Sequence, residues 1–308
     1  MADHRIYRNY QEGGTLHTKK TLAAVALGTA IAVLSAAPAL AACLSDQQVA
    51  DFAAALEAHR PAADLENVGE TDASCTRAKL NALHARKLGP VVGYKAGLTN
   101  PAVQKRFNYD QPVWGVLYRD MVLDTGAVVD AAFGARPLFE ADMLVRVKSA
   151  DINAAKTPAE VLAAIDQVIP FIELPDLAVQ TPPKLGGPGL AAINVAARLG
   201  VRGVAIDVPA DGAGQAALLQ SLRDMTVVMK DGAGNELARG KGSDILEHPL
   251  NAVVWLAGAL AREGIAMKPG DLISLGSFSP LLPPKAGQTV LVTYEGLARA
   301  QPVVVSFK

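Results

Sequence analysis

Apolar side chains recur at helical spacing in the early part of the chain, beyond residue 42. Val49, Phe52 and Leu56 fall on one face of a helix over 45–59, which Pro61 ends. A strongly amphipathic segment near the end of the chain, which Gly264 terminates, has the same character. The helices expected after the first are 76–88, 101–107, 158–167, 190–199 and 248–263.

From residue 113 onward, short apolar and alternating segments predict strands. Gly-containing turns separate them, and the run DGAGN at 231–235 is typical of a hairpin turn. The expected strands, including one ahead of residue 113, are 91–95, 114–117, 121–123, 137–147, 168–174, 226–230, 236–240, 271–277, 288–294 and 302–307. The chain is therefore predicted to be of the α+β class, with helices early and a strand-rich later part.

The segment ahead of these elements has a different character. The pair Lys19-Lys20 precedes an uncharged apolar run over 21–37, and the sequence Ala-Leu-Ala follows at 39–41. These are the marks of a secretory signal peptide, so we expect 1–41 to be removed and 42–308 to form a single domain. The alternative is an N-terminal membrane anchor, for which the run is slightly short. Residues 1–15 form an odd extension ahead of the basic pair, as a misassigned start codon would produce.

Composition narrows the class of function. The 308 residues include 29 basic and 30 acidic ones, and 50% are hydrophobic. The balanced charge argues against a nucleic-acid-binding protein, and the hydrophobic content is too high for a disordered chain. Without 1–41 the chain is mildly acidic. We expect a periplasmic or secreted protein that has no membrane span after cleavage.

The two cysteines, Cys43 and Cys75, lie early in the expected mature chain. An oxidising compartment would let them form a disulfide across a loop of about 30 residues, which stabilises a fold by about 3 kcal/mol. Alternatively, the sequence Leu-Ala-Ala-Cys at 40–43 fits the pattern before a lipid-modified cysteine, which would make Cys43 a lipid anchor. The even cysteine count favours the disulfide.

Three acidic residues in apolar segments carry the main chemical signal. Glu140 and Asp142 are two apart in an alternating strand, so their carboxylates share one face and can converge on one cation. Glu173 interrupts the apolar run 168–175, where a carboxylate is expensive to bury unless it is paired or coordinated. Three carboxylates suit Mg²⁺ or Mn²⁺. The alternative for 139–147 is a solvent-facing strand with ordinary acids.

One basic residue is a further candidate. Lys95 ends an expected strand just before the turn at 97–99, where it can point at an anionic substrate; the alternative is a surface lysine. His59 and His84 lie on expected helices without partners, so they do not indicate a zinc site.

Several motifs occur together in a defined order. They are GYKAGLT at 93–99, QPVWGVL at 111–117, FEAD at 139–142, FIEL at 171–174, EHPL at 247–250 and GDLISLGS at 270–277. Over roughly residues 46–308, this ordered set resembles the 2-keto-4-pentenoate hydratase and 4-oxalocrotonate decarboxylase branch of the fumarylacetoacetate hydrolase family. The resemblance implies a mixed β-roll or sandwich with flanking helices, and assembly into homo-oligomers.

The resemblance also implies roles for individual residues. They are Glu140, Asp142 and Glu173 as ligands of Mg²⁺ or Mn²⁺, Lys95 as the catalytic residue, and Gly276, Ser277 and Asn194 as substrate contacts. Three positions depart from the family pattern. Asp142 stands where glutamate is usual, and Val113 and Ile193 stand where the pattern has acids that would take part in proton transfer.

The activity expected from the resemblance is water addition to a 2-hydroxy-2,4-dienoate, a small 2-oxo acid in its enol form, by an exported lyase. Three alternatives stay open at this point. They are decarboxylation of a related 2-oxo diacid, hydrolytic cleavage of an acylpyruvate, and oxo-acid binding without turnover. Val113 and Ile193 favour the binding protein, whereas the intact set of three acids with Lys95 favours the enzyme.

Overall fold

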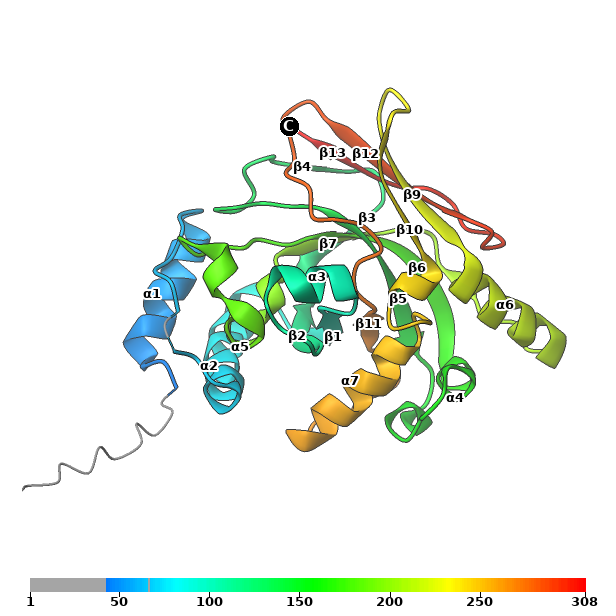
Figure 1. Ribbon diagram of the computed structural model, residues 1–308, viewed down its shortest axis with the longest axis horizontal. Coiled ribbons are helices and arrows are strands. Elements are labelled where there is room, and N and C mark those ends of the chain that lie inside the picture. The colour runs from blue at the N-terminus through cyan, green and yellow to red at the C-terminus, as the bar shows by residue number, and fades with distance from the viewer. Residues whose placement is uncertain (1–42, 66) are drawn as a thin grey trace, which may run out of the picture. The chain divides into compact units, whose positions relative to one another are not determined.

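The computed structural model describes residues 43–65 and 67–308, all within one compact unit that runs from Ala41 to Lys308 (Figure 1). The expected leader, 1–41, lies outside the described residues. The helices are α1 (Asp46–Glu57), α2 (Glu70–Leu88), α3 (Pro101–Arg106), α4 (Pro158–Ala163), α5 (Gly186–Ala192), α6 (Gly212–Asp224) and α7 (Asn251–Arg262). None of the helices in this described part is both long enough and apolar enough to cross a membrane.

The strands fall into two sheets. They are β1 (Val91–Gly97), β2 (Val113–Tyr118), β3 (Val122–Asp124), β4 (Ala127–Val129), β5 (Glu140–Val147), β6 (Ile165–Leu174), β7 (Leu199–Arg202), β8 (Ile206–Asp207), β9 (Thr226–Asp231), β10 (Glu236–Lys241), β11 (Leu272–Ser274), β12 (Thr289–Glu295) and β13 (Val303–Phe307). The larger sheet has the order β2-β1-β11-β5-β6-β7-β3, and β8 also pairs with β6. The smaller sheet has the order β10-β9-β12-β13-β4.

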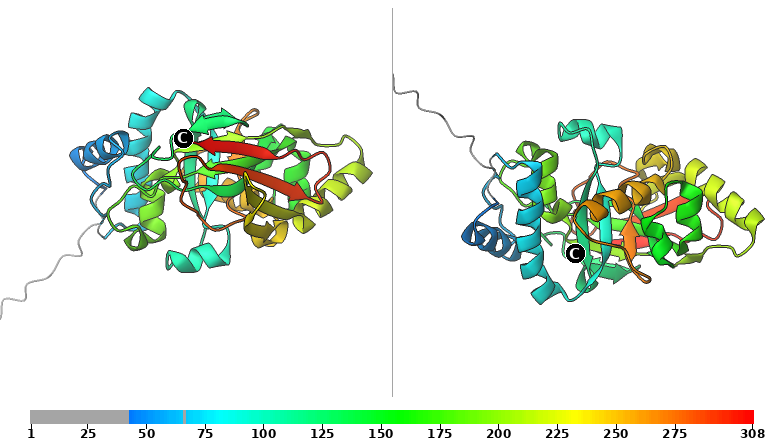
Figure 2. Two further views of the ribbon diagram at one scale, coloured as in Figure 1. Left: turned by 90° about the horizontal axis from the view of Figure 1, so that it is seen from above. Right: turned by 90° about the horizontal axis from the view of Figure 1, so that it is seen from below.

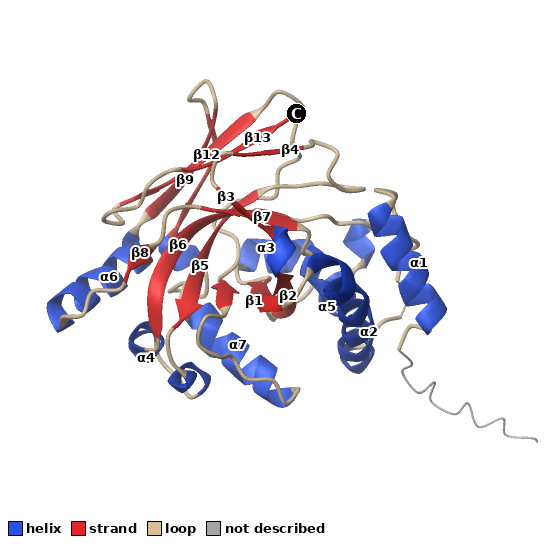
Figure 3. Ribbon diagram, turned by 180° about the vertical axis from the view of Figure 1, so that it is seen from behind, coloured by secondary structure: helices blue, strands red, loops and turns tan. Residues whose placement is uncertain are grey.

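The two sheets pack against each other, with helices at their sides. The smaller sheet covers part of the larger one, as the view from above shows (Figure 2). Seen from behind, α1, α2 and α5 gather at one end of the larger sheet, and α4, α6 and α7 lie toward the other (Figure 3). The main core joins both sheets to α7 through residues such as Met143, Val227, Val292 and Leu256, each at most 2% exposed. The predicted fold class, an α+β roll or sandwich with flanking helices, is confirmed.

Helix caps explain where the first two helices begin. Ser45 accepts a hydrogen bond from the Gln48 N–H at 3.2 Å, so α1 starts at the expected place. Helix α2 begins six residues before the expected start, because Asp72 accepts from the N–H of Gly69 at 3.2 Å and closes the first turn.

The later part of the chain departs from the expected elements at several points, among them the unexpected short strands β4, β7 and β8. Helix α4 ends at Ala163 rather than residue 167, because 165–174 continue as one strand paired with β5. The expected helix at 190–199 is instead α5, which ends at Ala192, followed by a left-handed turn (η4, Asn194–Ala196) with φ between 53° and 57°. Helix α6 was not expected, because its Gly-rich start hides the apolar spacing of Leu218 and Leu222.

Candidate functional site

Two neighbouring antiparallel strands, β5 and β6, carry the three acids. Glu140 lies directly opposite Glu173, and Asp142 lies directly opposite Phe171. The side chains of Glu140, Asp142 and Glu173 are 8%, 0% and 3% exposed. A solvent-facing strand is therefore excluded, since both faces of β5 at these positions are buried.

Lys95 reaches the same acids from β1. In the larger sheet β11 lies between β1 and β5, and Lys95 is opposite Ser274 of β11. The side chain is 2% exposed, so the surface-lysine alternative is excluded. Its Nζ forms an ion pair with Glu173 and donates to the carbonyl of Val195 at 3.1 Å. The structure thus joins residues that are 78 positions apart in the sequence.

Asp142 is held more tightly than the other two acids. Its carboxylate accepts hydrogen bonds from the Ser274 hydroxyl, from the Gly276 N–H at 3.0 Å and from its neighbouring N–H of Met143. Asp142 does not line the cavity that Glu140 and Glu173 face. The shorter side chain is therefore drawn toward β11 and the loop after it, and it is not part of the cavity lining.

Burial and like charge make this cluster electrostatically unusual. The pKa of Glu140 is raised well above its ordinary value, first by loss of solvation and then by the charge of Glu173. The pKa of Asp142 is also raised, mainly by burial, against the lowering effect of the Ser274 hydroxyl. Three carboxylates face a single ammonium group, so the fully ionised cluster carries two uncompensated negative charges.

A tyrosine from the smaller sheet fixes the two acid-bearing strands. Tyr294 of β12 donates its hydroxyl to the carbonyls of Asp142 and Phe171, the latter at 3.0 Å, and accepts from the Phe171 N–H at 3.0 Å. The carbonyls of Ala141 and Met143, on either side of Asp142, accept hydrogen bonds from N–H groups of the segment after β11. Because backbone groups alternate in direction along a strand, those of Asp142 point the other way, toward β6. The hydroxyl therefore sits within the β5–β6 ladder at the level of the acids. Nothing in the sequence pattern marks Tyr294 for this position.

Glu140, Glu173 and Lys95 line a cavity whose empty space, counted together with the solvent at its open mouth, is about 520 Å³. Its other lining is largely apolar, and Lys95 is the one cationic side chain that lines it among the described residues. The remaining lining residues are Ala96, Gly97, Leu98, Thr99, Asn100, Val103, Phe107, Pro175, Leu177, Leu190, Val195, Ala196, Gly276, Ser277 and Leu281. This combination is typical of a site for a small organic acid with an apolar tail.

The residues expected to contact substrate fall in different places. Gly276 and Ser277 line the cavity. Asn194 does not: its amide oxygen accepts from the Val116 N–H at 2.7 Å and its amide nitrogen donates to the Val116 carbonyl at 3.0 Å. Both ends of the Asn194 amide are thus used to hold the left-handed turn η4 against β2.

The two positions where the family pattern has acids, 113 and 193, are not part of the cavity lining either. Val113 and Ile193 are 6% and 5% exposed and belong to the hydrophobic cluster under α1 and α2. The side chains of Val113 and Val195 both pack beside Gly97. A Cβ built on Gly97 would lie only 2.5 Å from the Val195 side chain. In this chain both positions therefore serve packing.

The donor set fits a hard divalent cation in its chemistry. Within residues 43–65 and 67–308, no three His, Cys, Asp or Glu side chains are grouped as a formed metal site, because Lys95 pairs with Glu173 and the loop holds Asp142. Three buried carboxylates are nevertheless the ligands that Mg²⁺ and Mn²⁺ prefer, and the two excess negative charges match one such ion.

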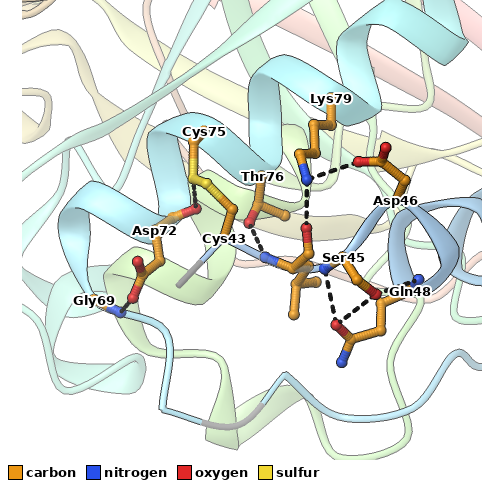
Figure 4. Close-up of a disulfide and its surroundings, with 10 residues drawn as sticks. Cys43, Ser45, Asp46, Gln48, Gly69, Asp72, Cys75, Thr76 and Lys79 are labelled. Atoms are coloured by element: carbon orange, nitrogen blue, oxygen red, sulfur yellow. Dashed lines mark hydrogen bonds and ion pairs between the residues drawn. A yellow bond between two sulfur atoms is a disulfide. The ribbon is translucent and has the colours of Figure 1, made fainter. Parts of the chain in front are cut away.

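The two cysteines lie apart from this cavity, where the chain enters α1. Cys43 and Cys75 form a disulfide, with their Cα atoms 5.8 Å apart (Figure 4). Polar contacts hold the same segment to α2: the Leu44 N–H donates to Thr76 at 3.2 Å, and Lys79 donates to the Leu44 carbonyl at 2.9 Å. The disulfide therefore fixes the start of the described chain to the body of the fold.

Comparisons with known proteins identify relatives of the chain. No family model matches the chain. The chain is 32% identical over 210 residues to a 2-keto-4-pentenoate hydratase of Burkholderia vietnamiensis, an alignment that covers 67% of this chain and 75% of the relative. It is 26% identical to the solved 4-oxalocrotonate decarboxylase of Pseudomonas putida G7, complexed with magnesium and adipate, with a TM-score of 0.71 over 87% of this chain and all of that one.

A more distant structure shares the fold. The fumarylpyruvate hydrolase of Pseudomonas aeruginosa, solved with Mn²⁺ and pyruvate, gives a TM-score of 0.50 at 13% identity, over 70% of this chain and 89% of that one. The fold and the relatives together define an enzyme of the lyase class. The chain belongs to the 2-keto-4-pentenoate hydratase and 4-oxalocrotonate decarboxylase branch of the fumarylacetoacetate hydrolase family, as the sequence motifs predicted.

Proposed function

We propose that this protein is a divalent-metal-dependent hydratase that adds water to a 2-hydroxy-2,4-dienoate and yields a 4-hydroxy-2-oxo acid. The observation that carries the proposal is the two-part lining of the cavity. Glu140, Glu173 and Lys95 supply its charged groups, and the rest of the lining is largely apolar, with residues such as Phe107 and Leu190. A substrate with one carboxylate and a short apolar tail matches both parts.

The same lining favours the hydratase over the decarboxylase. A 2-oxo diacid carries a second carboxylate, which needs a cation or several donors when it leaves water. Lys95 already pairs with Glu173, and among the described residues no arginine and no second lysine lines the cavity. A diacid would therefore leave one charge without a cation, among apolar and neutral polar side chains such as Phe107, Leu190 and Asn100, at a cost that a dienoate with an apolar tail avoids.

The charge of the cluster supports a metal requirement. When fully ionised, the acids with Lys95 carry an excess of two negative charges, which would repel an anionic substrate and which a divalent cation would neutralise. Glu140 and Glu173, with Asp142 behind them, would hold the ion. When bound, such an ion neutralises charge that develops on the 2-oxygen and carboxylate of the substrate.

The protein side chains perform the remaining tasks. Among the described residues, Lys95 is the one cationic side chain that lines the cavity, so its Nζ is the group that we propose holds and moves protons. The enol O–H proton moves to C5 as the ketone forms. The hydroxyl of water then adds at C4, and the other proton of that water goes to C3. The Val195 carbonyl, 3.1 Å away, keeps the Nζ aimed at the acids. The apolar wall limits the water that reaches the diene and orients its tail.

Loss of the dienoate absorbance, measured with added Mg²⁺ or Mn²⁺ and again with a chelator, tests the proposal. Turnover is expected with the metal and not with the chelator, and Glu140→Ala is expected to abolish it. Glu236→Ala, which changes an exposed acid on β10, is the matched control and should keep full activity. Release of CO₂ from an oxo-diacid, with no turnover of the dienoate, would instead support the decarboxylase.

We also propose that the protein is exported and works without a lipid anchor. The candidate signal peptide in the sequence and the Cys43–Cys75 disulfide support this, because a sulfur in a disulfide cannot carry a thioether-linked lipid. Mass spectrometry of the mature protein is expected to find Ala42 at the N-terminus and the two cysteines joined. A lipid mass on Cys43 would contradict the proposal. Homo-oligomer formation stays a prediction, which light scattering can check.

A further inference from the structure

One polar group at the cavity has no role in the structure as described. Thr99 follows β1, and its side chain is 2% exposed. Its hydroxyl has no hydrogen-bond partner in the part of the chain that the structure describes, although Thr99 lines the cavity together with Lys95 and Glu140. A buried hydroxyl without a partner lowers stability, so folded proteins seldom keep one unless something else binds it.

The backbone that presents this hydroxyl is held in a strained conformation. Leu98, just before Thr99, has φ of 53°, which is unfavourable for a branched side chain. Two hydrogen bonds maintain the turn: Gln104 donates to the Leu98 carbonyl at 2.8 Å, and the Leu246 N–H donates to the Thr99 carbonyl at 3.2 Å. Leu246 itself has φ of 46°. The turn is therefore fixed from two sides rather than left to relax.

The hydroxyl lies against the glycine of the opposite loop. A Cβ built on Gly276 would be 2.0 Å from Thr99 Oγ1, and Gly276 has φ of 101°. Glycine is thus required at 276 both for its backbone conformation and for the space beside Thr99. The two segments form one narrow part of the cavity, next to the loop that also carries Ser277.

The neighbouring serine is not equivalent to Thr99. The Ser277 hydroxyl donates to the Ser279 carbonyl at 2.6 Å and accepts from the Ser279 N–H at 3.2 Å. Its proton is therefore committed to its own loop. Of these two cavity hydroxyls, Thr99 is the one whose proton remains available to a ligand.

We propose that Thr99 is a substrate-binding residue, whose hydroxyl donates a hydrogen bond to the carboxylate of the 2-oxo acid beside Gly276. This inference rests on the proposed function, since it assumes that the cavity takes such an acid. A neutral donor suits this place, because it can bind the carboxylate without forming an ion pair with Glu140 or Glu173. It also explains why the strained turn at 98–99 is maintained.

The test compares ligand affinity with stability in the full mature protein. The probe is 2-oxopentanoate, a saturated 2-oxo monoacid, titrated calorimetrically in the presence of Mg²⁺. Thr99→Val keeps the shape and removes the hydroxyl, so it is expected to weaken binding by about 10- to 100-fold. Thr99→Ser should restore most of the affinity, and Ser277→Ala should cost less than Thr99→Val.

Thermal unfolding separates a binding role from a structural one. Because Thr99→Val removes an unpartnered buried hydroxyl, the melting temperature is expected to stay the same or rise. Thr293→Val, which removes a hydroxyl of β12 that donates to the Val228 carbonyl at 3.4 Å, is the matched control and should leave binding intact. Unchanged affinity in Thr99→Val, or a loss of affinity that only follows a loss of stability, would overturn the inference.

Turnover and binding by the wild type and by Thr99→Val together show whether the role of Thr99 or the proposed function is wrong. If the wild type turns over the dienoate and Thr99→Val does so with the same kcat/KM, Thr99 has no binding role and the hydratase proposal stands. If the wild type neither binds 2-oxopentanoate nor turns over the dienoate, the proposed function is wrong, and the role of Thr99 falls with it.

Discussion

The centre of the larger sheet and the two N-terminal helices are stabilised in different ways. Around β1, β5, β6 and β11, buried charges and hydrogen bonds face one another, and the acids lie at most 8% exposed. Around α1 and α2, a disulfide joins the chain, and the flanking ion pair of Lys79 with Asp46 is largely exposed, at 38% and 90%. The first region concentrates polar groups that are costly to bury, whereas the second adds a covalent link and a partly buried ion pair, that of Arg77 on α2 with Glu263.

We propose that the first region serves chemistry and the second serves stability. A buried charge cluster is a poor way to stabilise a fold, since desolvation offsets much of its attraction. Its presence in the sheet is better explained by the reaction. A disulfide, in contrast, limits the unfolded chain without placing any group near a substrate. Changes in the two regions should therefore separate activity from stability.

The largest effect is expected at Lys95. Lys95→Met removes the cavity's cation while keeping the length of the side chain, so kcat/KM for the dienoate should fall by about 10²- to 10⁴-fold. Lys79→Met makes the same change on α2, where the lysine binds the Leu44 carbonyl, and should keep wild-type activity. Initial rates of both variants measure this contrast. Similar activities of the two variants would contradict the assignment of chemistry to the sheet and of stability to the N-terminal helices.

Next in size is the loss of the disulfide. The double change Cys43→Ser and Cys75→Ser should lower the free energy of unfolding by about 3 kcal/mol, because it frees a loop closed across 32 positions. Urea unfolding measures this, and the reduced wild type should behave like the variant. Since no cysteine lines the cavity, kcat/KM should not change in the folded protein. A parallel loss of activity would show that α2 positions the site.

A change at Tyr294 is expected to lower both stability and activity. Tyr294→Phe leaves backbone groups of Asp142 and Phe171 without their hydroxyl partner and should cost about 1–3 kcal/mol of stability. Activity should fall as well, because the acids project from these strands. Tyr118→Phe removes another buried tyrosine's bond, to the Asn81 carbonyl at 3.1 Å, and should spare activity. Equal rates for Tyr294→Phe and the wild type would remove Tyr294 from the site.

The smallest effect concerns pH and the N-terminal helices. The pKa of His84 on α2 is lowered to about 4, first by burial and then by the positive charge of Arg198. The folded state therefore binds this proton less readily than the unfolded state, and stability should decline as pH falls from 6.5 toward 4. The decline should be on the order of 1 kcal/mol, given partial exposure. Urea unfolding of His84→Gln should show a flatter pH dependence; an identical slope would contradict this origin.

The sequence was most informative where the site follows a regular strand. The alternation in 139–147 placed Glu140 and Asp142 on one face, and the apolar run around Glu173 marked a buried acid. These patterns are local, since each depends on a strand period of two. The fold class and the family also followed from ordered motifs, and the comparisons confirmed both.

The rest depended on contacts that no local pattern encodes. Glu140 lies opposite Glu173 only because of the register between β5 and β6. Lys95 can pair with Glu173 only because β11 lies between β1 and β5 in the sheet. The left-handed turn at Val195 interrupts what has helical composition, because the Asn194 amide binds the backbone of Val116. Asn194 therefore has a structural partner where the family resemblance implied a substrate contact. Tyr294 gave no signal, since a tyrosine in a strand is ordinary.

The place of β11 in the larger sheet has a consequence for the order of synthesis. Residues 272–274 lie between β1 and β5, and the hydroxyl that joins β5 to β6 comes from residue 294 of 308. A growing chain is made from its N-terminus, so Lys95 and the three acids exist long before the strand and the tyrosine that set their spacing. The cavity therefore lacks part of its frame until residues 272–294 have been made, long after the charged side chains that line it.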